Sequence, residues 1–211
     1  MRRLRNVLLV VASFGAASAF VGTREPDDAI AGAPTFSIAI GDAQLRDDLS
    51  DARGELDLAN AQLQRMSRVF AYSSRYGIGA DLAGAIYDVA LAEGIDPELA
   101  FRLVKIESQF NERATSPVGA VGLTQVMLPT ARYFRKDVTR EDLLDRETNL
   151  RIGFRYLRAL MREYDGDLKL ALLVYNRGPV AVESALDSGR DPANGYERAI
   201  LTGYQGRGIV D

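Results

Sequence analysis

Apolar residues recur at alternating steps of four and three positions along one stretch of this 211-residue chain. Such spacing places the side chains on one face of an α-helix, in the pattern of a coiled-coil seam. The residues between them are mostly charged or polar, so the apolar face is narrow. The sequence therefore predicts one long amphipathic helix over residues 42–76. Its heptad stripe consists of Leu45, Leu49, Ala52, Leu56, Ala59, Leu63, Met66 and Phe70.

Two kinds of surface could cover the heptad stripe. In one interpretation, the helix lies along the face of the domain that follows it. In the other, a short coiled coil joins two copies of the protein or binds a partner helix. A seam of this length is marginally stable on its own, and the sequence leaves both interpretations open.

After the heptad stripe, apolar residues keep a helical period almost to the C-terminus. No segment alternates with period two for long enough to make a sheet. The run LKLALLVY at residues 168–175 is apolar nearly all round, as expected of a helix inside a core. We therefore predict an all-α domain over residues 77–211. Its helices are expected near residues 80–93, 97–109, from 129, 140–144, 149–164, 168–175, 179–186 and 196–201.

The N-terminal residues have the pattern of an export signal. Three arginines precede an apolar run that ends in small residues, with Ala17-Ser18-Ala19 as a cleavage site. The run is shorter than the roughly 20 residues that span a bilayer. We expect residues 1–19 to be removed and the protein to lie in the periplasm or cell envelope; left uncleaved, they would anchor it to a membrane. Residues 20–41 mix Pro, Gly, Ala and Asp without a period and are expected to form a flexible linker.

The chain contains no Cys and no His, which excludes several classes of chemistry. Disulfides, thiolate nucleophiles, Ser-His-Asp triads and metal sites built from Cys or His all require one of these residues. Acid–base chemistry must therefore rely on carboxylates, Tyr or Lys. The net charge of −3 becomes more negative when the signal is removed, so nucleic acid is not an expected partner.

Glu107 is the carboxylate whose position favours catalysis. It follows Ile106 near the end of an amphipathic helix, where the chain enters a loop that contains glycines. Partial burial raises the pKa of a carboxyl group, and a carboxylic acid that is protonated near neutral pH can protonate a leaving glycosidic oxygen. From the residues alone, a solvated glutamate paired with Lys105 or Arg113 is the commoner arrangement.

From Glu107 to Gln125 the chain reads ESQFNERATSPVGAVGLTQ. This stretch resembles the signature of the soluble lytic transglycosylase (SLT) domains, a branch of the lysozyme-like superfamily. Matching blocks follow in order over about residues 81–201: Pro129-Thr130-Ala131, Asn149-Leu150 with Gly153 and Tyr156-Leu157, Gly166-Asp167 with Ala171, and Val174-Tyr175-Asn176-Arg177-Gly178-Pro179.

The resemblance implies a lysozyme-like domain over residues 77–211 that acts on peptidoglycan glycan strands without a metal or cofactor. Such enzymes cut the β-1,4 bond between N-acetylmuramic acid (MurNAc) and N-acetylglucosamine (GlcNAc), and leave a 1,6-anhydro ring on MurNAc. Glu107 matches the family's single catalytic acid. Between Glu107 and Lys136 the only other carboxylate is Glu112, whereas typical glycosidases use two carboxyl groups about 5–9.5 Å apart.

The resemblance also implies binding roles for other positions. Gln125 is expected to bond to the glycan, and Gly122 to let the backbone approach a sugar ring. Ser108 is expected to steady Glu107 or the adjacent loop. Tyr175 and Asn176 are expected to complete the site.

Three positions depart from the family pattern. Thr124 stands where Met is usual, which would remove an apolar wall from the cleft and add a hydroxyl group. Arg177 stands where a small residue is common. No acidic residue precedes Tyr196, although Tyr196 is still expected to reach the cleft. A hydrolytic muramidase on the same fold, and a non-catalytic peptidoglycan-binding or scaffold module, are the alternative functions.

Overall fold

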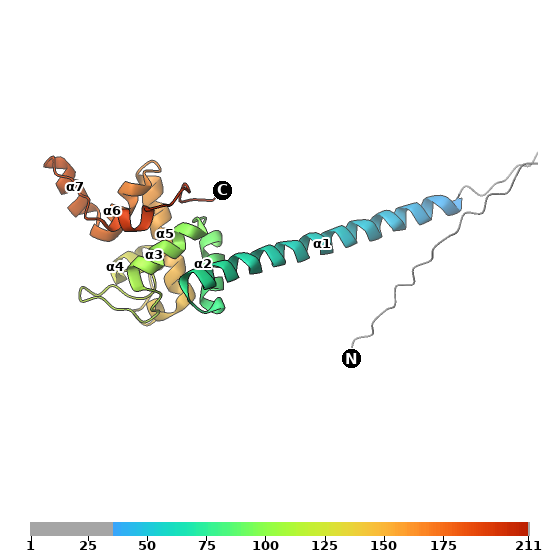
Figure 1. Ribbon diagram of the computed structural model, residues 1–211, viewed down its shortest axis with the longest axis horizontal. Helices are drawn as coiled ribbons and strands as arrows, with labels where there is room; N and C mark the ends of the chain where they lie inside the picture. Colours follow the sequence, from blue (N-terminus) through green and yellow to red (C-terminus); the bar gives the residue numbers. More distant parts are fainter. Residues whose placement is uncertain (1–35, 211) are drawn as a thin grey trace, which may run out of the picture. The chain divides into compact units, whose positions relative to one another are not determined.

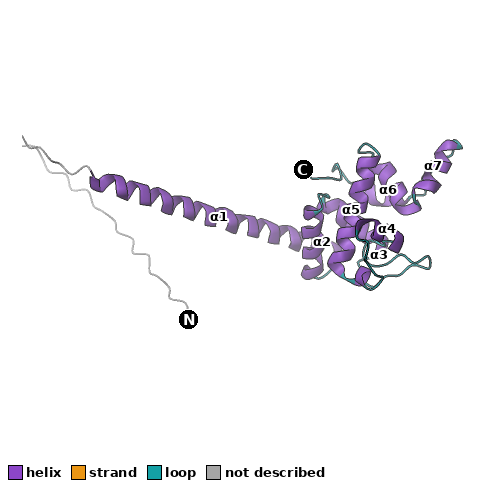
Figure 2. Ribbon diagram, turned by 180° about the vertical axis from the view of Figure 1, so that it is seen from behind, coloured by secondary structure: helices purple, strands orange, loops and turns teal. Residues whose placement is uncertain are grey.

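The computed structural model describes residues 36–210, and their regular secondary structure is entirely helical (Figures 1 and 2). The prediction of an all-α protein is confirmed. Backbone pairing outside helices is limited, among these residues, to isolated bridges such as Thr115 with Val121. No helix in this part of the chain is long and apolar enough to cross a membrane. The helices are α1 (Phe36–Tyr76), α2 (Ala80–Ala92), α3 (Pro97–Ser108), α4 (Leu128–Phe134), the 3-10 helix η1 (Asp142–Leu144), α5 (Arg146–Glu163), α6 (Leu168–Arg177), α7 (Pro179–Asp187) and α8 (Tyr196–Leu201).

The predicted N-terminal boundaries differ from those of the structure at two points. Helix α1 begins at Phe36, inside the segment 20–41 that was expected to be a linker. One compact unit comprises Gly54–Asp211 and another the residues up to Arg53. The boundary expected at residue 77 therefore lies inside the unit Gly54–Asp211. The expected signal, residues 1–19, lies outside the described residues.

The C-terminal part of α1 contacts the helical domain through its aromatic side chains. The ring of Tyr72 stacks on Phe101 of α3 with centroids 4.2 Å apart, and Tyr76 stacks on the same ring at 5.4 Å. Phe101 is fully buried. These contacts explain why the last turns of α1 belong to the same compact unit as α3.

The heptad stripe is on a different side of α1 from the contacts with the domain. Within the unit that begins at Gly54, Leu56, Leu63 and Phe70 are each about 60% exposed. Val69, by contrast, is buried, and the Nε of Arg65 donates to Asp88 Oδ1 of α2 at 2.7 Å. For this part of α1, the interpretation that the stripe packs on its own domain is therefore wrong.

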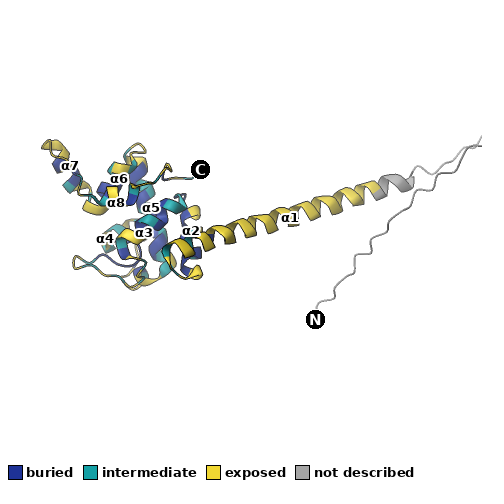
Figure 3. Cartoon of the chain, in the orientation of Figure 1, coloured by how far each residue is buried: buried dark blue, intermediate teal, exposed yellow. Residues whose placement is uncertain are grey.

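The core lies where α2, α3, α5 and α6 pack together, and Figure 3 shows the buried residues on these helices. The prediction for residues 168–175 holds, because the consecutive residues from Ala171 to Tyr175 are all buried. The largest fully buried side chains include Ile86, Leu99, Phe101, Phe154, Leu157 and Leu172.

Aspartate caps fix where three of these helices begin. Asp96 accepts from the Glu98 amide before Pro97, and Asp167 accepts from the Leu170 amide, both as the sequence predicts. Helix α5 starts at Arg146, earlier than the expected residue 149, because Asp145 accepts from the amide of Thr148. Caps of this kind each stabilise a helix by about 1 kcal/mol.

Candidate active site

The side chain of Glu107 is partly buried at the last turn of α3 and accepts a hydrogen bond from the Tyr196 hydroxyl of α8. Burial raises the pKa of Glu107 to about 7, while the bond from Tyr196 acts in the opposite direction because it stabilises the carboxylate. At neutral pH, Glu107 is thus present in both protonation states. Such a group can donate a proton in one step and accept one in the next.

Tyr196 keeps its proton at neutral pH and donates it in the hydrogen bond to Glu107. Burial, and then the nearby charge of Glu107, raise the pKa of this phenol well above 10. The hydroxyl therefore keeps its proton and can hold the Glu107 carboxyl group in one orientation. Tyr196, which was predicted to reach the cleft, thus contacts Glu107 directly.

Tyr175 lies in the last turn of α6, at the end of its buried stretch. Its hydroxyl donates to the carbonyl of Thr124 at 2.8 Å, and its ring packs against Tyr156 at 5.1 Å. Burial raises the pKa of Tyr175, and the charge of Glu107 is the next cause. Tyr175, Tyr196 and Glu107 are thus close enough to influence one another, although Tyr175 bonds to the loop rather than to Glu107.

The loop that carries residues 121–125 is anchored by Asn149, which is buried at the start of α5. Its Oδ1 accepts from the Thr124 amide at 2.9 Å, and its Nδ2 donates to the carbonyls of Val121 and Leu143 at 2.9 and 2.8 Å. The sequence analysis assigned Asn149 no role at the site. The sequence feature that could have identified Asn149 is its polar side chain within a matching block, beside Leu150 on a helix that faces the core.

Thr124 is fully buried, so the prediction that its side chain lines the cleft is wrong. Its hydroxyl donates to Asn149, whose Oδ1 is 2.7 Å away. A Cβ on Gly153 would lie 2.3 Å from this hydroxyl oxygen, which shows how closely Thr124 packs on α5. The residue contributes to the site through its carbonyl, which accepts from Tyr175.

Gly122 is required by packing inside the protein. Its φ is +77°, and a Cβ there would lie 2.2 Å from Asn149 Nδ2 and 2.7 Å from the carbonyl oxygen of Leu143. A side chain would therefore break the anchor of the loop. This close packing alone explains why position 122 is a glycine, and the expected approach of a sugar ring is not needed for that explanation.

Gln125 and Ser108 both make contacts with their own backbone surroundings. The side-chain Nε2 of Gln125 donates to the backbone carbonyls of Gly122 at 2.9 Å and Ala114 at 3.3 Å. Ser108 donates to Val104 at 3.1 Å within α3, so the expected contact with Glu107 is not formed. Gln125 nevertheless faces the cavity described next, whereas the side chain of Ser108 is buried.

A cavity of about 280 Å³ lies between the loop after α3 and the end of α6. It brings together three of the predicted site residues, Gln125, Tyr175 and Asn176. The Oδ1 of Asn176 accepts from Asn194 at 2.9 Å. The full lining is Val118, Gln125, Val126, Met127, Thr130, Tyr156, Tyr175, Asn176, Arg177 and Gly178.

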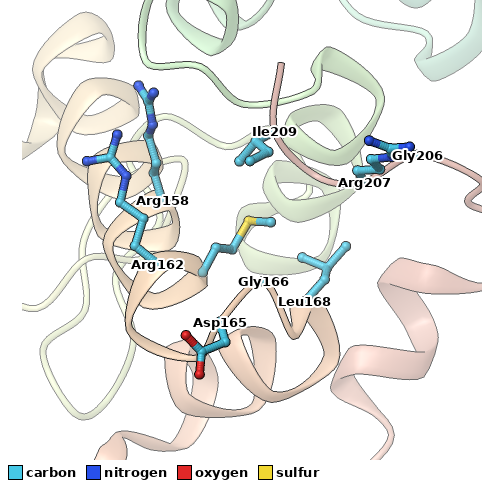
Figure 4. A pocket seen from close by; sticks show the side chains of 9 residues that line it. Arg158, Arg162, Asp165, Gly166, Leu168, Gly206, Arg207 and Ile209 are labelled. Atoms are coloured by element: carbon cyan, nitrogen blue, oxygen red, sulfur yellow. The ribbon is translucent and has the colours of Figure 1, made fainter. Parts of the chain in front are cut away.

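A larger cavity, of about 800 Å³, lies between α5 and the C-terminal segment (Figure 4). Arg158 and Arg162 project from α5, and Ile209 and Arg207 come from the C-terminal segment. None of the predicted site residues line this cavity, so it is separate from the site around Glu107.

Other carboxylates near Glu107 in sequence or in space have different roles. Glu112 accepts from Arg146 at 2.6 Å and forms an ion pair with it. Glu197 is buried in α8, and its Oε2 has no hydrogen-bond partner among the described residues. Over the same residues, no group of three or more acidic side chains could hold a metal ion.

The family model for the transglycosylase SLT domain matches residues 85–195 of this chain. Among curated proteins, the soluble lytic murein transglycosylase of Salmonella typhimurium is 33% identical over 114 residues, which cover 50% of this chain and 18% of that protein. The transglycosylase of Enterobacteria phage PRD1 is 39% identical over 84 residues, 40% of this chain and 30% of that protein. The chain thus spans less than a third of the length of these relatives.

Solved structures show the same fold. The 70 kDa soluble lytic transglycosylase of Escherichia coli superposes with a TM-score of 0.51 at 26% identity, over 62% of this chain and 24% of that one. A complex of the 70-kDa soluble lytic transglycosylase with bulgecin A superposes with a TM-score of 0.53 at 23% identity, over 66% and 27%, and shows the fold alone. Because the family model covers more than half of the sequence, and the helical fold agrees with it, the chain belongs to the transglycosylase SLT domain family.

Proposed function

We propose that this protein is a peptidoglycan lytic transglycosylase. It would cleave the β-1,4 bond between MurNAc and GlcNAc and leave a 1,6-anhydro ring on MurNAc. The observation that carries the proposal is the state of Glu107: a carboxyl group with a pKa of about 7, held by Tyr196, at the position of the acid in the SLT motif. The Salmonella typhimurium relative is a soluble lytic murein transglycosylase, which supports peptidoglycan strands as the substrate.

One carboxyl group suffices for both halves of this reaction. Protonated Glu107 gives its proton to the glycosidic oxygen, and the bond from that oxygen to C1 of MurNAc breaks with its electron pair on the oxygen. The ionised carboxylate then takes the proton of the C6 hydroxyl group, and the oxygen of that hydroxyl group bonds to C1 of the same MurNAc. Glu107 is protonated again at the end, and no water is consumed. A pKa near the working pH suits both steps.

The surroundings of Glu107 favour a single-carboxylate mechanism. Burial and the bond from Tyr196 account for the pKa of Glu107, with no contribution from another carboxylate among the described residues, and Glu112 is paired with Arg146. A hydrolytic muramidase on the same fold would use water in place of the C6 hydroxyl group. A binding or scaffold module would have no use for a carboxyl group with a raised pKa.

Substrate contacts are proposed for the residues whose side chains reach the cavity or Glu107. Gln125 and Asn176 would bond to the sugar, Tyr175 would form an aromatic wall, and Tyr196 would orient the acid. Gly122, Thr124 and Ser108 would act indirectly, by keeping the loop and the end of α3 in place.

The test is the mass of the fragments released from purified peptidoglycan sacculi. A lytic transglycosylase releases muropeptides that are lighter by one water than those of a muramidase. Wild-type protein should give the lighter products, and Glu107→Gln should give none. Products of the heavier mass would establish hydrolysis, and cell-wall effects that persist unchanged in Glu107→Gln would favour the scaffold function.

We further propose that the heptad stripe of α1 associates with a second copy of the chain. Support comes from the exposure of its leucines within the unit that begins at Gly54 and from the seam pattern itself. Export to the periplasm through residues 1–19, followed by cleavage, would bring the protein to its substrate. Fractionation of cells and N-terminal sequencing of the mature protein would test the export.

A further inference from the structure

Arg177 is the only charged residue among the ten that line the cavity beside the site. It lies in the last turn of α6, two residues after Tyr175. The other lining residues are apolar or carry neutral polar groups. Under the proposed function, the cavity would thus present one positive charge to the glycan strand.

The charge of Arg177 is not neutralised by the described part of the protein. No ion pair joins it to a carboxylate there, and its one hydrogen bond runs from Nη1 to the carbonyl of Pro192 at 2.5 Å. A guanidinium group has five N–H donors, so most of them remain available. The residue is exposed. The bond to Pro192 holds the guanidinium group in place, so ligand binding would cost less side-chain conformational entropy.

Arg177 is also independent of the acid. The causes of the raised pKa of Glu107 are burial and the bond from Tyr196. The charge of Arg177 is therefore not needed to tune the acid and can serve a ligand.

We propose that Arg177 binds a carboxylate on a substituent of the glycan and so determines which strands are cut. This inference rests on the proposed function. A guanidinium group matches a carboxylate through two parallel N–H···O bonds. GlcNAc carries no carboxylate. The lactyl group on MurNAc ends in one when it bears no peptide, and a stem peptide carries carboxylates of its own.

The experiment compares soluble glycans that differ only in their carboxylates. Peptide-free and peptide-bearing strands are each assayed untreated and after conversion of their carboxylates to methylamides, and kcat and KM are measured from the release of anhydro products. For the strand that carries the recognised group, amidation should raise the wild-type KM about tenfold, as expected for the loss of one charge-assisted pair. If amidation raises KM for peptide-free strands, Arg177 binds the lactyl carboxylate. If amidation raises KM only for peptide-bearing strands, Arg177 binds a carboxylate of the stem peptide.

Three variants separate recognition from loop anchoring. Arg177→Gln should abolish the difference in KM between untreated and amidated strands, and Arg177→Lys should restore part of it because the charge returns without the planar fork. Arg190→Gln removes an exposed arginine that bonds to Ser188 outside the cavity, and should change nothing. The pH profile of kcat should be the same in all three variants.

Two results would overturn the inference. If Arg177→Gln raises KM equally for charged and amidated strands, Arg177 only anchors the segment around Pro192. If the wild-type KM is the same for both kinds of strand, no carboxylate is recognised. Failure of the proposed function is distinguishable, because the wild-type protein would then release no anhydro product from any substrate.

Discussion

The Tyr196 hydroxyl donates to the Glu107 carboxylate across a separation of 89 residues, which joins α8 to the end of α3. Neither helix could place the acid alone. Helix α3 ends at Ser108, and the φ of 50° at Gln109 turns the chain away. Helix α8 then supplies the one hydrogen bond that Glu107 receives from another described side chain. The protonation state of the acid therefore depends on a residue near the other end of the domain.

Replacing Tyr196 by Phe should raise the pKa of Glu107 further. The lost bond is the one that lowers this pKa, so the ionised form becomes less favourable and the alkaline limb of the pH profile moves to higher pH. We expect kcat to fall about tenfold or more, as for the loss of a hydrogen bond to a charged group. Initial rates of anhydro-product release between pH 5 and about 9 would measure both effects. An alkaline limb that stays at the wild-type pH, or that moves to lower pH, would contradict this account.

Glu107→Gln should stabilise the protein at alkaline pH. The pKa of Glu107 is raised from 4.5 to about 7 in the folded protein, so the folded state binds more protons than the unfolded chain between these values. Wild-type stability is therefore lost as the pH rises through this window, whereas the Gln variant is unaffected. The gain at pH 8 should reach up to about 3 kcal/mol and should vanish near pH 4. Urea unfolding at both pH values measures it, with Glu55→Gln on the exposed helix α1 as the control.

Asn149→Ala should destabilise the domain by about 3–5 kcal/mol. The change leaves the Thr124 amide and the carbonyls of Val121 and Leu143 buried without their partner. Asn60→Ala is the matched control, because this asparagine is exposed on α1 and its loss should stay within about 0.5 kcal/mol. Denaturant unfolding compares the two. Equal losses would mean that the loop does not depend on Asn149.

Glu197→Gln tests whether Glu107 is the only carboxyl group in the reaction. Neighbouring positions on a helix point about 100° apart, so the side chain of Glu197 is directed away from that of Tyr196, which contacts Glu107. We expect the rate of anhydro-product release to stay within about twofold of wild type, because the neutral amide replaces a buried carboxyl group whose Oε2 has no hydrogen-bond partner among the described residues. A loss as large as that of Glu107→Gln would reveal a second catalytic carboxylate.

Self-association through α1 can be tested with single cysteines, since the chain has none of its own. Met66→Cys lies in the heptad stripe and should form disulfide-linked dimers under mild oxidation, because equivalent seam positions face each other in a coiled coil. Gln64→Cys lies outside the stripe and should cross-link far less. Light scattering on the unaltered protein provides the direct check. A monomer at all concentrations, with equal cross-linking of both variants, would argue for a partner of another kind.

The helices could be predicted because their signals are local. Periodic leucines and aspartate caps such as Asp96 and Asp167 fixed most boundaries, and the start of α5 was missed where the cap Asp145 was overlooked. Glu107 was identified because it lies within a recognisable motif. The role of Thr124 was mistaken for the opposite reason: its environment depends on Asn149, which is 25 residues away. A pattern along the chain does not show which polar side chains tertiary contacts bury, and these contacts decide how the loop beside the acid is held.

The stacking of Tyr72 and Tyr76 on Phe101 has a mechanical consequence. Phe101 lies on α3 less than two turns before Glu107, so a force along the last turns of α1 acts on the helix that carries the acid. A load transmitted through the last turns of α1 would act on this aromatic contact and on the ion pair of Arg65 with Asp88 of α2. The packing of the last turns of α1 and the position of Glu107 therefore both depend on α3.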